Sequence, residues 1–216
     1  MTKPEVFIIE SLKFSEETDY REGEMIYRSL RMSLKEPIYR YVRTLTEFEH
    51  FVEEFGESNY RYLHISCHGS KGGLSMTLDH ITTHDVGEIV GPALDGKRLF
   101  LSTCLASTPA MAEAVFKNGG CTSLAGPKNK INFDDSVILW TSFYHLMFKA
   151  NQKAMKRDQL RGTLSKCAST VGEKINFYRP GKDRTALHAL LPEPIQKTTV
   201  ARTREASTGG RQARNG

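Results

Sequence analysis

A histidine and a cysteine each follow directly on an apolar segment of this sequence that is typical of a β-strand. His68-Gly69 follows segment 60–66, and Cys104 follows segment 98–103. In open parallel sheets the functional crevice lies beyond the carboxyl ends of the strands, so neighbouring strands would bring both side chains to one sheet edge. A thiolate beside an imidazole attacks carbonyl carbon, and the main-chain amide of Gly69 could stabilise the resulting oxyanion. The pair therefore predicts thiol-dependent nucleophilic catalysis, with Cys104 as nucleophile and His68 as base.

The remaining cysteines carry no sign of a metal site or of a disulfide framework. The chain has four cysteines without paired metal-ligand spacing, and in a reducing compartment they are expected to be free thiols. Cys67 precedes His68 and lies on the opposite face of its strand by the period-two rule, which predicts a core position. We expect structural roles for Cys121 and Cys167, and a packed environment for His64.

Strands and helices alternate along the chain. Apolar or alternating segments predict strands, and helical spacing with caps predicts helices, the second of which begins at an N-cap Thr46 with Glu49 as capping-box partner. This alternation predicts an α/β fold with a mostly parallel central sheet and helices on both faces. The expected strands are 6–10, 38–43, 60–66, 74–78, 98–103 and 121–125, and the expected helices are 22–34, 46–56, 83–90, 109–117, 134–149 and 151–174.

Two acidic residues, Asp134 and Asp135, open one of these expected helices. Their ordinary role is to cap the helix N-terminus and to interact favourably with its dipole. The alternative role is to line the pocket for the substrate side chain before the scissile bond, which would select Arg or Lys. The sequence favours the capping role and keeps the pocket role as a hypothesis.

Length and composition indicate one globular domain followed by a basic tail. The chain has 216 residues, of which 39% are apolar and 25% charged, and we expect a domain over 1–190. No apolar run approaches the roughly 20 residues that span a bilayer, and the N-terminus does not resemble a signal peptide, so a cytoplasmic protein is expected. The stretch 69–73 is glycine-rich but lacks the spacing of a phosphate-binding loop.

The tail, residues 191–216, carries most of the net charge of +5. Its lack of apolar periodicity predicts disorder, and its charge permits only weak contacts with nucleic acid or an acidic partner. From residue 197 onward the tail carries a net charge of +4, so the rest of the chain is close to neutral. The charged residues of this segment are Lys197, Arg202, Arg204, Glu205, Arg211 and Arg214.

The order of these motifs resembles the caspase-like cysteine peptidases, most closely the bacterial CHAT domains. The resemblance covers roughly residues 5–175 and rests on YLHISCHG, GGLSM, LSTCLAS, AVFKNGGCTSLAG and SVILWTSFYHLMF in this order. It implies a three-layer caspase-like sandwich in which His68 is the catalytic base, Cys104 the nucleophile and Gly69 part of the oxyanion hole. Position 102 is serine, whereas relatives that cut after basic residues often have an acid two positions before the cysteine, so the preferred substrate residue stays open.

Three functions are compatible with this reading. The first is a cysteine endopeptidase that cleaves a protein target under control, without a cofactor and with a regulatory protein acting in trans. The resemblance implies a bacterial stress, defence or cell-death pathway. The second is a catalytically idle caspase-fold module for protein interaction, against which the intact His68 and Cys104 argue. The third, a different Cys–His hydrolase or transferase, usually places its cysteine at a tight strand-to-helix turn, whereas a loop follows Cys104 here.

Overall fold

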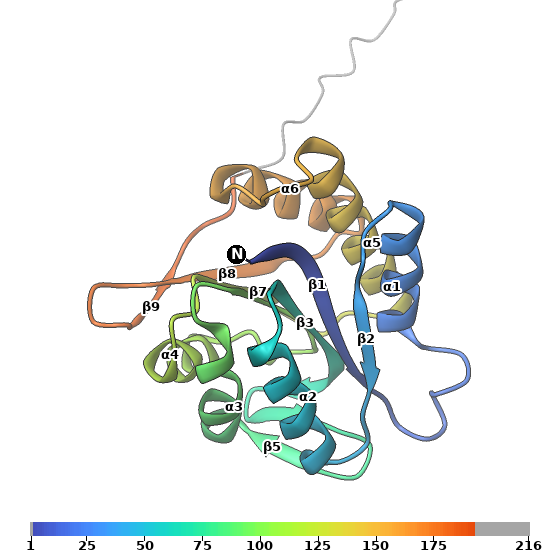
Figure 1. Ribbon diagram of the computed structural model, residues 1–216, viewed down its shortest axis with the longest axis vertical. Coiled ribbons are helices and arrows are strands. Elements are labelled where there is room, and N and C mark those ends of the chain that lie inside the picture. The colour runs from blue at the N-terminus through green and yellow to red at the C-terminus, as the bar shows by residue number, and fades with distance from the viewer. Residues whose placement is uncertain (1, 193–216) are drawn as a thin grey trace, which may run out of the picture.

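The computed structural model describes residues 2–192, and its strands form one mixed sheet (Figure 1). Along the sheet the order is β2-β1-β3-β6-β7-β8-β9, with β4 joined to β3 and β5 joined to β4. The pairs from β2 to β7 are parallel, and β8 and β9 add an antiparallel edge. The strands are β1 (Lys3–Ser11), β2 (Ile38–Tyr41), β3 (Tyr60–Ser70), β4 (Gly73–Ser75), β5 (His80–Thr82), β6 (Arg98–Ser102), β7 (Ser123–Pro127), β8 (Ile175–Pro180) and β9 (Ala186–His188).

Helices cover both faces of this sheet, which gives three layers and confirms the predicted α/β class. Figure 1 shows α2, α3 and α4 on one side of the strands and α1, α5 and α6 on the other. The helices are α1 (Glu22–Met32), α2 (Leu45–Glu57), α3 (Thr83–Val90), α4 (Pro109–Asn118), α5 (Phe133–Ala150) and α6 (Arg157–Thr170), with a short 3₁₀ turn at Pro92–Leu94.

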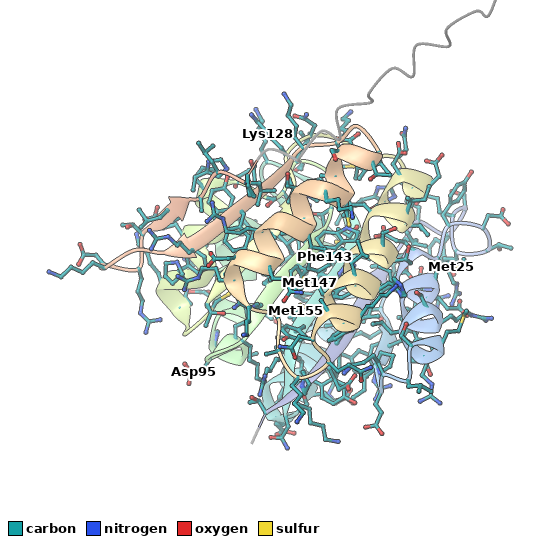
Figure 2. All side chains as sticks on the ribbon, turned by 90° about the horizontal axis from the view of Figure 1, so that it is seen from above. Met25, Asp95, Lys128, Phe143, Met147 and Met155 are labelled. Carbon is teal, nitrogen blue, oxygen red and sulfur yellow. The ribbon has the colours of Figure 1, made fainter. Side chains whose placement is uncertain are left out.

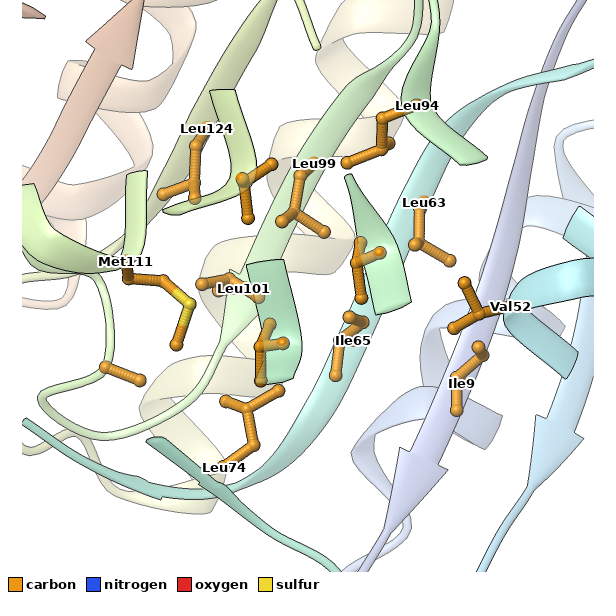
Figure 3. Close-up of a cluster of buried hydrophobic side chains, with 14 of the residues drawn as sticks. Ile9, Val52, Leu63, Ile65, Leu74, Leu94, Leu99, Leu101, Met111 and Leu124 are labelled. Carbon is orange, nitrogen blue, oxygen red and sulfur yellow. The ribbon is translucent and has the colours of Figure 1, made fainter. Parts of the chain in front are cut away.

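Two hydrophobic cores form because successive side chains of each strand point to opposite faces. The core under α2, α3 and α4 contains Leu63 and Ile65 of β3 beside Leu99 and Leu101 of β6 (Figure 3). A parallel strand buried on both faces needs apolar residues at every position, which explains the continuous apolar runs of β1 and β6.

The second core lies under α1, α5 and α6 and is rich in aromatic side chains. Phe100 of β6 contacts Phe143 and Tyr144 of α5 with ring centroids 5.3 and 5.8 Å apart. Phe143 and Met147 of α5 lie near Met155 in the turn before α6 (Figure 2). All of these side chains are buried, so this core anchors the C-terminal half of α5 over the sheet.

The cap predicted for the second helix is wrong by two residues. Thr44, not Thr46, is the N-cap, and its side chain accepts a hydrogen bond from the backbone of Glu47 while the Glu47 carboxylate bonds back to Thr44. The pair Thr44 and Glu47 and the pair Thr46 and Glu49 both have the spacing of a capping box. The carboxylate of Asp79 also accepts a hydrogen bond from the backbone N–H of Leu45 at 2.7 Å, and this contact favours the earlier start of the helix.

The C-terminal part of the chain departs most from expectation. The helix predicted over 151–174 begins only at Arg157, because the Asn151 side chain accepts the amides of Lys153 and Ala154 and holds a turn there. The strands β8 and β9 were not predicted. From residue 193 onward the basic tail lies outside the described residues. Among residues 2–192 no helix has the length and apolar character that a bilayer crossing requires.

A buried lysine closes the end of α2 and supplies a test of the packing. The Lys97 ammonium donates to the carbonyls of Phe55, Gly56 and Ser58 at 2.9, 3.1 and 3.1 Å. We expect Lys97→Met to lower the free energy of unfolding by about 2–3 kcal/mol, because these carbonyls would lose their donor. Urea denaturation measures it, with the exposed Lys117→Met as control. Equal, small effects of both substitutions would contradict this account.

Candidate active site

The register of β3 against β6 brings His68 and Cys104 together. Paired residues of the two strands differ by 36 positions, up to the last pair, Ser66 and Ser102. Two residues further along, the same offset joins His68 to Cys104. Both side chains line one cavity of about 50 Å³, which we call the inner cavity. The predicted pair therefore lies at one sheet edge, on the face that α1 and α5 cover.

Gly69 permits the close approach of the two strand ends. A Cβ atom at this position would lie 2.9 Å from the carbonyl oxygen of Cys104 and 3.1 Å from the Cβ atoms of Thr103 and Ala106. Any side chain at position 69 would push the segment that carries Cys104 away. Gly69 also pairs with Leu74 of β4, so β3 continues through His68 rather than ending before it.

A carboxylate that the sequence analysis did not single out contacts the histidine. Glu16 lies in the loop between β1 and α1, and its Oε2 atom is 2.6 Å from Nε2 of His68. The same oxygen accepts a hydrogen bond from the backbone N–H of Lys13. Burial alone would raise the pKa of Glu16, but the hydrogen bonds from His68 and Lys13 and their charges lower it. The edge of the Phe133 ring packs against the imidazole, with centroids 5.7 Å apart.

The Glu16 contact decides which nitrogen of His68 is free to act. An ionised carboxylate only accepts hydrogen bonds, so Nε2 carries the proton and Nδ1 is left to receive one. Glu16 thus holds the ring and stabilises the imidazolium, the role that a third residue has beside a catalytic histidine. The signal that could have revealed it is its place after β1, whose carboxyl end lies beside that of β3.

The cysteine thiol is half-buried and contacts a backbone carbonyl group. Cys104 Sγ donates to the carbonyl oxygen of Ile131 at 3.5 Å, and within residues 2–192 no hydrogen bond joins it to His68. The next residue, Leu105, has a φ of 59°, a left-handed conformation that costs a bulky residue on the order of 1 kcal/mol. The backbone therefore turns sharply just after the sulfur, and α4 begins only at Pro109.

A buried carboxyl group lies directly beneath the pair. Glu22, the first residue of α1, is 3% exposed and accepts hydrogen bonds from the hydroxyls of Ser66, Ser102 and Ser136 at 3.2, 2.5 and 3.0 Å. It lines the inner cavity together with His68 and Cys104. From the sequence, Glu22 is expected only as the first residue of the helix over 22–34.

Burial controls the charge of this carboxyl group. Burial and, to a smaller extent, the nearby Glu10 together raise the pKa of Glu22 to about 8, against the lowering effect of the serine hydroxyls. Glu10 is itself buried, which raises its pKa, and it accepts from Gly23 N–H and the Tyr39 hydroxyl at 2.6 and 2.7 Å. Glu22 is therefore neutral at pH 7 when the cavity holds no cation.

A larger cavity of about 710 Å³ adjoins the inner one, and Glu22, Asn132 and Phe133 line both. We call it the outer cavity. Asp134 lines it, whereas Asp135 lines neither. The predicted capping role of both residues is wrong, because α5 begins at Phe133 after Asn132 and they occupy its first turn, where the helix dipole still favours their charge.

The other predicted positions agree with the structure. Cys67 is 7% exposed, and burial strongly raises the pKa of its thiol. Burial likewise raises the pKa of Cys121 to about 12 and that of Cys167 to about 11, so all three are poor nucleophiles at neutral pH. His64 is fully buried, with Nδ1 3.0 Å from the Tyr144 hydroxyl, and burial lowers its pKa to about 3.

No protein-family model matches this chain, and no curated protein matches it significantly.

The charge of Glu22 leads to a prediction about stability. Its pKa is about 8 in the folded chain and near 4.5 in the unfolded one, so between these values the folded chain binds more protons and its stability falls as pH rises. Between pH 6.5 and 8 the free energy of unfolding of the wild type should fall by on the order of 2 kcal/mol, and we expect this fall to be absent in Glu22→Gln. Urea denaturation at both pH values measures it, and Glu24→Gln, at a partly exposed position of the same helix, is the control. Parallel curves for wild type and Glu22→Gln would contradict the buried neutral state.

The Glu16 contact predicts a single tautomer of His68. Long-range ¹H–¹⁵N NMR spectra should show neutral His68 protonated on Nε2, because the carboxylate accepts that proton. In Glu16→Ala we expect exchange between both tautomers, whereas Glu17→Ala, whose carboxylate pairs with Arg43 instead, should keep the wild-type spectrum. A wild-type ring protonated on Nδ1 would disprove the assigned roles of the two nitrogens.

Proposed function

We propose that this chain is a cysteine endopeptidase with a caspase-like fold, in which Cys104 is the nucleophile and His68 the base. The observation that carries the proposal is the constant offset between β3 and β6, which brings both residues to one cavity. The contact of Glu16 with Nε2 of His68 supports the proposal, because this contact leaves Nδ1 free for proton transfer. No metal or organic cofactor is needed for this chemistry.

The reaction proceeds in two halves. Nδ1 of His68 takes the thiol proton, and the Cys104 thiolate attacks the peptide carbonyl carbon to form a tetrahedral oxyanion, for which the Gly69 amide is the proposed donor. Collapse breaks the C–N bond, the amine leaves with the proton from His68, and a thioester remains on Cys104. Water then gives a proton to His68 and attacks the thioester, which releases the acid and restores the thiol.

The wider setting rests on the resemblance to CHAT domains. It extends the proposal to regulated cleavage of a protein target in a bacterial stress, defence or cell-death pathway, with a regulatory protein acting in trans and a cytoplasmic site of action. The order of the elements supports this extension: a parallel strand ending in His-Gly, an antiparallel pair, a helix, and a second parallel strand followed by cysteine.

One observation favours the alternative, a caspase-fold module for protein interaction. The thiol donates to the Ile131 carbonyl and not to His68, so in this conformation the proton has no path to the base. Ile131 belongs to the segment between β7 and α5, and a partner or substrate that shifts this segment would free the thiol. Catalytic hydrogen bonds often form only in the substrate complex, so the same contact also fits a latent enzyme.

Peptide cleavage tests the proposal directly. Wild type, Cys104→Ala and His68→Ala are each incubated with a proteome-derived peptide library, and the new termini are identified by mass spectrometry. We expect cleavage by the wild type, and a loss of at least about 1000-fold in both variants, because each removes one member of the catalytic pair.

The matched controls are Cys121→Ala and His145→Ala, which change a buried thiol under the other face and an exposed imidazole on α5. They should keep the wild-type cleavage pattern. Cleavage that survives in Cys104→Ala would overturn the proposed nucleophile. A folded wild type that cleaves no peptide, with or without cell extract to supply an activator, would favour the interaction module.

A further inference from the structure

The inner cavity holds a carboxyl group at the position where a substrate side chain would enter. Ser66 and Ser102 lie two residues before His68 and Cys104 on the same face of the sheet, and both hydroxyls bond to Glu22. A peptide whose carbonyl carbon reaches Cys104 Sγ must place the side chain of that residue close by. Glu22 is the acidic residue that lines this cavity together with Cys104.

We propose that the inner cavity binds a basic side chain, that of Lys or Arg, in the residue whose carbonyl is attacked, with Glu22 as its counter-ion. This inference rests on the proposed peptidase function, for which it supplies the substrate class. Position 102 itself is serine, but its hydroxyl contacts Glu22. Glu22, which is distant in the sequence, thus brings an acidic group next to position 102.

The charges around the cavity suit a cation. Within residues 2–192 no lysine, arginine or histidine forms an ion pair with Glu22. Glu10 adds negative charge from β1. Arg21, on the outer cavity, is turned away, since it bonds to the Glu17 carbonyl and lies over the Tyr41 ring at 4.7 Å. A cationic head group would supply the positive charge that Glu22 lacks as a partner, and it would shift Glu22 to its ionised form.

The dimensions also fit one head group. A cavity of about 50 Å³ has room for roughly three to five water molecules, which an ammonium or guanidinium group with its adjoining methylene groups would displace. Ile131 and Phe133 supply apolar wall for the methylene stem. The three serine hydroxyls hold the Glu22 carboxyl group in place before the substrate arrives, and each can donate to it once it is ionised.

Asp134 is the competing acid, and its position makes it the weaker candidate. It is exposed and lines the outer cavity but not the inner one. A charge that faces water contributes little to selectivity, whereas a buried group left without its partner discriminates strongly. The structure thus favours Glu22 over the residue that the sequence put forward.

Peptidyl acyloxymethyl ketones that alkylate an active-site thiol test this inference. Three probes differ only in the residue next to the reactive carbonyl, which is Lys, Leu or Asp, and intact-mass spectrometry gives the rate at which each modifies Cys104. We expect the Lys probe to react at least about 100-fold faster than the other two with wild type. In Glu22→Gln this ratio should fall below about 5, because the amide keeps the shape but carries no charge.

Glu24→Gln, which removes a partly exposed carboxylate that pairs with Arg28 in the same turn of α1, should keep the wild-type ratio. An unchanged ratio in Glu22→Gln, an equal fall in Asp134→Asn, or a wild type that prefers Leu or Asp would each overturn the inference while leaving the peptidase intact. If no probe modifies Cys104 faster in wild type than in His68→Ala, the catalytic pair itself fails and the inference fails with it.

Discussion

Parallel pairing of β3 with β6 at an offset of 36 residues is the constraint on which the site depends. It holds along the paired length of both strands as far as Ser66 and Ser102, and two residues further on it sets His68 beside Cys104, with no hydrogen bond between them among the described residues. Gly69 maintains this closeness, because a larger residue would collide with the carbonyl of Cys104. The two hydrophobic cores, one on each face of the sheet, then hold in place the strands that carry His68 and Cys104.

A polar layer lies between the aromatic core and the reactive pair. Glu22 and its three serine partners fill the space that an apolar residue would occupy in an ordinary sandwich. Burying a carboxyl group is costly unless it is hydrogen-bonded, and the uncharged state reduces that cost further. The fold therefore carries a group that adds little stability and is suited to binding a charge. Such a group is expected at a functional site.

The sequence predicted local features well and distant contacts poorly. The apolar runs before His68 and Cys104 identified two strands, because period and termination are local properties, whereas only the structure shows that these strands are neighbours. Glu16 and Glu22 had no local signal of function. They come from the loop after β1 and from the start of α1, and only the folded sheet brings them to the pair. In the antiparallel edge, β8 was not recognised as a strand despite its six residues, and β9 has three residues, too few for a pattern.

Competition among the four cysteines for limiting iodoacetamide at pH 7 tests the catalytic pair most directly. In the folded wild type we expect Cys104 to be alkylated first, by at least about 10-fold over the other three thiols, since burial raises the pKa of those three and the half-buried Cys104 shares its cavity with His68. In His68→Ala this advantage should disappear. A Cys104 no more reactive than Cys67, Cys121 and Cys167, or one equally reactive without His68, would contradict the account.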